Sequence, residues 1–89
     1  MARVVATHSV GDMDTWLAGG ANRAVLFKQF CSGYRIYRHP TASKVAVVWE
    51  DADLPKLEAT LAHPDTQKAK VKDTVLDPID VYVEVVGGR

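Results

Sequence analysis

Three segments of this chain carry apolar residues at consecutive positions, where a sheet with one wet face would alternate apolar and polar residues. Residues 45–49 form an unbroken apolar run, residues 4–6 form a shorter one, and residues 79–86 carry apolar side chains in both phases. An 89-residue chain has too few residues for helices to cover both faces of such a sheet. We therefore expect helices on one face and a second copy of the chain on the other.

The individual elements follow from periodicity and from the turn residues between the apolar segments. The pattern predicts four strands, over residues 3–10, 34–38, 44–50 and 79–86. Apolar residues at spacings of three and four predict a helix from Met13 to Phe27, with Asp12 as its N-cap. The Gly19-Gly20 pair predicts an interruption or a close backbone approach there, because each glycine costs a helix about 1 kcal/mol relative to alanine.

A second helical region is predicted between the third and fourth strands. Asp53 precedes Leu54-Pro55 as in a capped helix start, and residues 63–65 (HPD) resemble another start, with a short continuation over residues 66–72. Asp77-Pro78 is expected to stop this region at the mouth of the last strand. The resulting β-α-β-β-α-β order predicts a ferredoxin-like α+β fold, an antiparallel sheet of order four-one-three-two with the helices on one face.

Composition narrows the functional classes. The chain is predicted to be one domain over residues 1–89, and a domain this small buries only about 60% of its unfolded surface, which dimerisation would remedy. Eleven basic residues balance eleven acidic ones, so we expect neither nucleic acid nor a membrane as partner. Cys31 is the only cysteine, and the N-terminus turns polar too soon for a secretory signal. Both observations indicate the cytoplasm.

The predicted topology gathers polar and aromatic residues at the two ends of the sheet. His8 and His39 follow strand ends, and His63 ends a helix, so we expect all three histidines at one end with Trp16 and Arg38. The opposite end is expected to hold a second set of residues: Tyr34, Arg35, Trp49, Glu50 and Glu84.

Five segments share the pattern of a known superfamily: VGDMDTW at residues 10–16, GYRIYR at 33–38, VAVVW at 45–49, DADL at 51–54 and HPD at 63–65. With them the chain resembles, over nearly its whole length, the small dimeric α/β-barrel proteins. These include antibiotic-biosynthesis monooxygenases, polyketide cyclases, muconolactone isomerases and stress-response barrels. The resemblance implies two ferredoxin-like sheets that meet as a barrel, with a pocket beside each sheet. It does not specify a reaction, because members use different residues for different chemistries.

His8 is the first candidate for acid/base chemistry, because imidazole titrates near neutral pH and can pass a proton in either direction. Cofactor-independent cyclases of the superfamily also tend to carry a histidine near the end of this strand. Tyr34 or Arg38 is predicted to stabilise developing oxyanion charge. The alternative for His8 is a structural or rim-exposed position.

Aromatic residues supply the predicted substrate-binding wall. Trp16, Phe27 and Trp49 would exclude water from a planar ligand, and Glu50 would act as a base if it were buried. Core or dimer packing is the alternative for the aromatic residues, and solvation is the alternative for Glu50. The histidines show no metal-ligand spacing, so neither a metal nor another cofactor is predicted. The lysines at positions 68, 70 and 72 are predicted to be solvated.

The sequence predicts a cofactor-independent enzyme acting on an apolar or aromatic, polyketide-like small molecule, as a proton-transfer cyclase or isomerase or a cofactor-free monooxygenase. The alternative is a non-catalytic small-molecule-binding or stress-response module, including a regulatory amino-acid-binding domain. A buried cavity that opens toward His8 would favour the enzyme, and a filled interior the alternative. An RNA-recognition module, a metallochaperone and an acylphosphatase are argued against, because the expected positions lack their signature residues.

Overall fold

The computed structural model describes residues 2–85, which fold as four strands and four helices. In chain order they are β1 (Ala2–Val10), α1 (Met13–Ala18), α2 (Gly20–Phe27), β2 (Gly33–Arg38), β3 (Lys44–Ala52), α3 (Leu54–Ala62), α4 (Pro64–Lys72) and β4 (Val75–Val83). Each of the two predicted helical regions is divided into a pair of helices. The first region breaks at Gly19, which caps both α1 and α2, so the predicted interruption is confirmed.

Polar side chains begin three of the helices at the predicted positions. The Asp12 carboxylate accepts a hydrogen bond from the Thr15 amide at 3.0 Å, and the Asp53 carboxylate accepts one from the Lys56 amide at 3.2 Å. The His63 ring caps α4 in the same way. Each cap satisfies an amide that the first helical turn leaves without a partner. Within residues 2–85, no helix has the length and apolarity that a membrane crossing requires.

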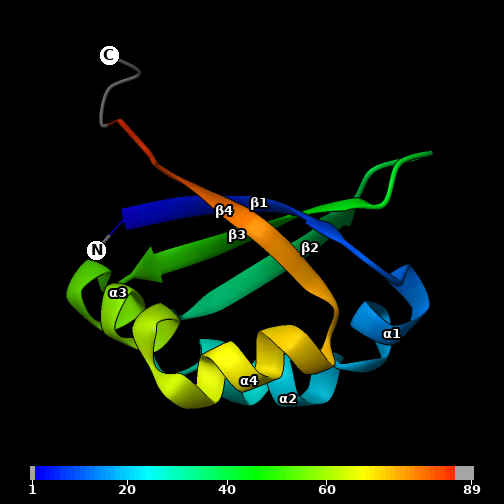
Figure 1. The fold of residues 1–89 in the computed structure, drawn as a ribbon. Helices are drawn as coiled ribbons and strands as arrows, with labels where there is room; N and C mark the ends of the chain where they lie inside the picture. Colours follow the sequence, from blue (N-terminus) through cyan, green and yellow to red (C-terminus); the bar gives the residue numbers. More distant parts are fainter. Residues whose placement is uncertain (1, 86–89) are drawn as a thin grey trace.

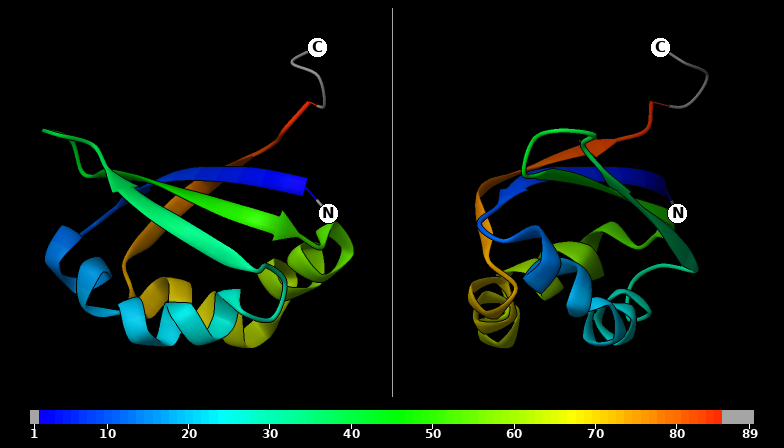
Figure 2. Two further views of the ribbon diagram at one scale, coloured as in Figure 1. Left: turned by 180° about the vertical axis from the view of Figure 1, so that it is seen from behind. Right: turned by 90° about the vertical axis from the view of Figure 1, so that its right-hand side faces the viewer.

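The four strands form one antiparallel sheet in the order β2-β3-β1-β4, which confirms the predicted order. All four helices lie against one face of this sheet (Figure 1). Figure 2 shows the opposite face without any helix over it. The ferredoxin-like α+β fold is therefore confirmed for the single chain.

The hydrophobic core lies between the sheet and the helices. Seven side chains of the two central strands are at most 3% exposed: Val4, Ala6, Val10, Val45, Val47, Trp49 and Ala52. Trp16 of α1, Phe27 of α2 and Leu57 of α3 pack onto them and are also buried. Their burial is the main stabilising contribution that holds the helical layer on the sheet.

The uncovered face is formed by the alternate residues of the same strands. In register, Val5 of β1 lies between Val48 of β3 and Tyr82 of β4. Tyr37, Leu76 and Tyr82 are 50%, 48% and 59% exposed. Apolar side chains therefore occupy both faces of the sheet, as the sequence pattern indicates, while a second copy of the chain over this face remains a prediction.

The start of the last strand differs from the prediction. β4 begins at Val75 rather than at Ile79, and it runs through Asp77-Pro78. The predicted boundary at Pro78 is wrong, because β4 is an edge strand and an edge tolerates a residue without an N–H donor. The register with β1 also shifts opposite this segment. Residue 86 and the predicted tail, 87–89, lie outside the described residues.

Candidate functional site

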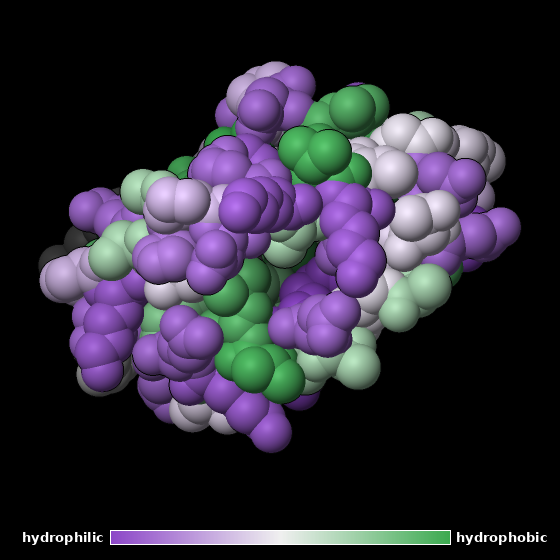
Figure 3. Space-filling model, turned by 60° about the horizontal axis from the view of Figure 1, so that its bottom comes forward, coloured by the Kyte–Doolittle hydropathy of each residue, from purple (hydrophilic) through white to green (hydrophobic). Residues whose placement is uncertain are grey.

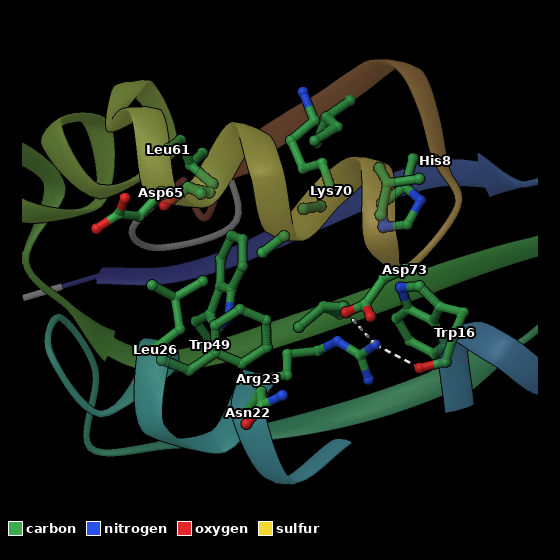
Figure 4. Close-up of a pocket in the computed structure, with 17 residues that line it drawn as sticks. His8, Trp16, Asn22, Arg23, Leu26, Trp49, Leu61, Asp65, Lys70 and Asp73 are labelled. Carbon is green, nitrogen blue, oxygen red and sulfur yellow. Dashed lines mark hydrogen bonds and ion pairs between the residues drawn. The ribbon is translucent and has the colours of Figure 1, made fainter. Parts of the chain in front are cut away.

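A cavity of about 200 Å³ lies between the inner face of the sheet and helices α2 and α4. Its floor comes from β1, β3 and β4, and Trp16 of α1 closes one end (Figure 4). Apolar atoms form most of the wall. Figure 3, which brings the helical side forward, shows hydrophobic side chains at the bottom of a hollow bordered by hydrophilic ones.

His8 reaches this cavity from β1. It pairs in register with the buried Val45, so its side chain lies on the helical face of the sheet. Nδ1 lies 3.0 Å from the Ser9 carbonyl oxygen, and only the Nδ1–H tautomer can donate to that acceptor. Nε2 of the neutral ring therefore carries a lone pair. Burial lowers the pKa of His8 below its ordinary value of 6.5, and the charges of Arg23 and Lys70 lower it further.

Arg23 of α2 is the main cation of the cavity wall. Its guanidinium carbon lies 3.8 Å from the centre of the Trp16 ring, and Nη2 donates to the Trp16 carbonyl. Nη2 also donates to the Asp73 carboxylate at 3.3 Å, and both side chains are largely buried. Burial lowers the pKa of Arg23, although the group stays charged at neutral pH. Nε and Nη1 have no hydrogen-bond partner within residues 2–85.

Because Gly19 has no side chain, it leaves the space that the Asp73 carboxylate occupies. A Cβ at Gly19 would lie 2.6 Å from Oδ1 of Asp73, whereas a Cβ at Gly20 would meet nothing within 4 Å. The φ of Gly19 is −80°, so the position needs glycine for space rather than for conformation. The predicted close approach is therefore present together with the interruption.

Gly19→Ala is expected to destabilise the protein by about 1–3 kcal/mol, because the carboxylate must move away from Arg23, its buried partner. Gly20→Ala is the matched control and is expected to be neutral or stabilising by up to about 1 kcal/mol, because alanine favours helix. Urea unfolding followed by circular dichroism measures both values. Equal stabilities of the two variants would show that the contact with Asp73 is unimportant.

The two ends of the cavity differ in polarity. Lys70 of α4, 17% exposed, donates to the Asp77 carboxylate at 3.0 Å, and it lies with His8 and Arg23 on the polar side of the cavity (Figure 4). The other side consists mainly of large apolar groups from α2, β3 and α3: Leu26, Phe27, Val47, Trp49 and Leu61. A ligand with one polar end and an apolar body would match this distribution.

Four of the seven predicted site residues share this cavity: His8, Trp16, Phe27 and Trp49. Two predicted oxyanion-stabilising residues lie outside the cavity wall. Tyr34 packs edge-on against Phe27, with ring centroids 5.0 Å apart. Arg38 is exposed, and Val45 lies between it and His8 in the sheet register. The cavity brings neither of them to His8.

Glu50 also lies outside the cavity, in an ion cluster on the uncovered face of the sheet. Its carboxylate accepts a hydrogen bond from Nε of Arg3 at 2.8 Å, and Glu84 lies 3.4 Å from the same guanidinium. The three side chains are 36–54% exposed. Glu50 is therefore solvated, as the alternative interpretation states, and it is not a buried base.

The three histidines do not gather at one end of the sheet. His63 begins α4, and this nine-residue helix, about 13 Å long, separates it from Thr74, whose backbone bonds to the end of β1. The prediction failed because α4 runs back along the sheet after α3 ends. His39 accepts hydrogen bonds from the turn amides of Thr41 and Ala42. Among the described residues, no group of histidine, cysteine, aspartate and glutamate could hold a metal ion.

Sequence reasoning missed the polar residues that α2 and α4 contribute. Arg23 lies seven positions after Trp16, which places both on one helical face, but the break at Gly19 obscures that spacing. The prediction that Lys70 is solvated was wrong. Two positions along a helix turn the side chain by about 200°, so Lys68 and Lys72 face water while Lys70 faces the sheet.

Several solved structures share this fold. A Bordetella bronchiseptica protein, described as a candidate antibiotic biosynthesis monooxygenase, is 20% identical over 94% of both chains, with a TM-score of 0.73. SnoaB from Streptomyces nogalater, a cofactor-independent oxygenase whose structure is that of a mutant, is 18% identical over 97% of this chain and 96% of its own, with a TM-score of 0.60. Rv0793 from Mycobacterium tuberculosis is 16% identical over 94% of this chain and 92% of its own, with a TM-score of 0.57.

No protein-family model and no curated protein matches the sequence. At identities of 20% or less, the structural likeness establishes the fold. The predicted resemblance is confirmed at that level: the chain shares the ferredoxin-like fold of solved structures that are described as antibiotic biosynthesis monooxygenases.

Proposed function

We propose that the cavity is the active site of a cofactor-independent enzyme that removes a proton from a small, largely apolar molecule, with His8 as the base. The observation that carries the proposal is the position of His8. Its Nδ1–H is held by the Ser9 carbonyl, and the ring lines a largely apolar cavity beside a guanidinium. A buried cavity at His8 is the feature that favours an enzyme over a non-catalytic binding module.

The first step follows from the protonation state of His8. The lowered pKa leaves the ring neutral at pH 7, so Nε2 can accept a proton from an acidic C–H or O–H group of the substrate. The bond electrons remain on the substrate as an enolate or phenolate. Arg23, through Nε or Nη1, then donates a hydrogen bond to the developing oxyanion. The apolar wall strengthens this interaction, because a guanidinium stabilises charge more effectively where water is excluded.

The fate of the anion separates the candidate reactions. In an isomerase or cyclase, the protonated His8 returns its proton after the bond rearrangement. In an oxygenase, the anion reacts with dioxygen, and a CH₂ group plus O₂ gives C=O plus H₂O. The fold shared with SnoaB, a cofactor-independent oxygenase, favours oxygenation among these outcomes.

A cavity of about 200 Å³ limits the size of the substrate. An apolar cavity of about 150 Å³ holds one benzene molecule, so this space suits one or two rings. A larger polyketide-like substrate would have to extend through the opening between α2 and α4.

Deuterium exchange tests the proposed step without knowledge of the natural substrate. The protein is expected to accelerate incorporation of deuterium beside the carbonyl of 1-tetralone, a two-ring enolisable ketone, measured by NMR in D₂O. The rate should fall on acidification with a midpoint below pH 6.5, because protonated His8 cannot act as a base and burial lowers its pKa. A rate that rises on acidification would contradict His8 as the base, and exchange equal to that in buffer alone would contradict the proposed activity.

The uncovered sheet face is proposed to pair with a second copy of the chain. Val5, Val48 and Tyr82 lie side by side across three strands, and exposed tyrosine and leucine side chains continue this surface. Burial of such apolar area drives association of small domains. The cavity lies on the helical side of the sheet, so this association would leave its wall intact.

A further inference from the structure

A threonine hydroxyl lies in the apolar part of the cavity. Thr66 of α4 is 4% exposed and is the one buried polar residue among residues 2–85. It lines the cavity, and its hydroxyl makes no hydrogen bond within residues 2–85 and is open to the cavity rather than enclosed by protein. Threonine in a helix can donate its hydroxyl proton to a carbonyl three or four residues earlier.

A hydroxyl in this environment is costly unless a partner satisfies it. The surrounding wall is largely apolar: Leu26, Trp49 and Leu61 lie on this side of the cavity (Figure 4), and the indole N–H of Trp49 also has no partner among the described residues. Either water or a bound molecule can enter the cavity and satisfy the hydroxyl, and a ligand oxygen would take the place of water there. Thr66 can donate to a carbonyl oxygen or accept from a hydroxyl, so either group on a ligand would satisfy it.

The rise of helix α4 indicates how far the Thr66 hydroxyl lies from the polar end of the cavity. Lys70, whose charge acts on His8, lies four residues after Thr66, and Asp73, which pairs with Arg23, lies seven residues after it. At 1.5 Å per residue these steps correspond to about 6 Å and 10 Å along α4. These axial spacings set the scale for the separation of the polar groups on a ligand that contacts both places.

We propose that Thr66 is a second polar contact of the cavity, and that the ligand is a flat apolar molecule with a hydrogen-bonding oxygen at each end. One oxygen lies at His8 and Arg23, and the other lies at Thr66. This inference rests on the proposed function, because it assumes that the cavity takes a small molecule. It adds that the substrate class is one with two opposed oxygen functions, and that Thr66 determines this specificity.

Two naphthols that differ by one hydroxyl test the inference by isothermal titration calorimetry. 2,6-Dihydroxynaphthalene is expected to bind the wild-type protein more tightly than 2-naphthol. Thr66→Val keeps the side-chain shape and removes the hydroxyl, so it should weaken binding of the diol about two- to tenfold, the value of one neutral hydrogen bond. Binding of 2-naphthol, which can use its oxygen at the His8 end, should change much less.

Two controls isolate the distal contact. Thr66→Ser retains the hydroxyl and should keep the preference for the diol. 2,3-Dihydroxynaphthalene has both oxygens on one ring edge and should gain nothing from Thr66. Thermal unfolding verifies that both variants are folded.

The outcomes separate this inference from the proposed function. If the naphthols bind but Thr66→Val affects the diol and 2-naphthol equally, Thr66 is not a ligand contact and the inference is wrong while the cavity remains a binding site. If none of the naphthols binds the wild-type protein at millimolar concentration, the proposed small-molecule site is contradicted and the inference with it.

Discussion

Replacing His8 with alanine is expected to lower the rate of deuterium exchange into 1-tetralone by about 10²- to 10⁴-fold, the usual contribution of a general base. The reason is geometric: His8 is the one histidine in the cavity wall, and its Nε2 carries the lone pair that would take the proton. His8→Gln should be equally inactive, because an amide can hydrogen-bond but cannot accept a proton at neutral pH.

His39→Ala is the matched control for this experiment. His39 is exposed and accepts hydrogen bonds within the β2–β3 turn, away from the cavity wall. This variant should exchange deuterium at the wild-type rate. Wild-type activity in His8→Ala with an unchanged fold would remove His8 from the mechanism and leave a binding module as the better description.

Val48→Lys is expected to convert the proposed dimer into a monomer. Val48 lies on the central strand β3 of the uncovered face, next to Val5, so a partner copy would have to bury the new charge. An unpaired buried ammonium costs several kcal/mol, which corresponds to a rise in the dimer dissociation constant of at least about 100-fold. Sedimentation equilibrium at micromolar concentrations measures this change.

Val71→Lys serves as the control for the association experiment. Val71 is 80% exposed on α4, in the helical layer, and the substitution should leave the sedimentation of the protein unchanged. A folded wild-type protein that sediments as a monomer at these concentrations would contradict the proposed partner over the sheet.

Local chemistry explains what could be predicted about the fold. The caps Asp12 and Asp53 act on amides three residues away, and the glycine break is a local feature of the chain. The strand order follows from the predicted element order and from the handedness of the connections. The start of β4 could not be predicted in the same way, because acceptance of Pro78 depends on its place at the edge of the finished sheet.

The candidate site could be predicted only in part, for a related reason. His8 and Trp49 lie on strands that the sequence predicts, but apolar residues at consecutive positions do not reveal which face of the sheet each side chain occupies. Arg23 and Asp73 are 50 residues apart in the chain and meet only when α4 returns along the sheet. No periodicity within one segment reveals such a pair. Tyr34 and Arg38 have side chains suited to stabilising an oxyanion, but their places in β2 keep them outside the cavity wall.

The cavity also gives the protein a built-in optical signal. The chain contains two tryptophans, and both line this one space. Trp16 is stacked under a guanidinium, and the Trp49 indole N–H is buried without a hydrogen-bond partner among the described residues. Indole emission is sensitive to its immediate surroundings, so all of the tryptophan fluorescence of this chain originates from the wall that a ligand would touch. Entry of a molecule can therefore be followed on unlabelled protein.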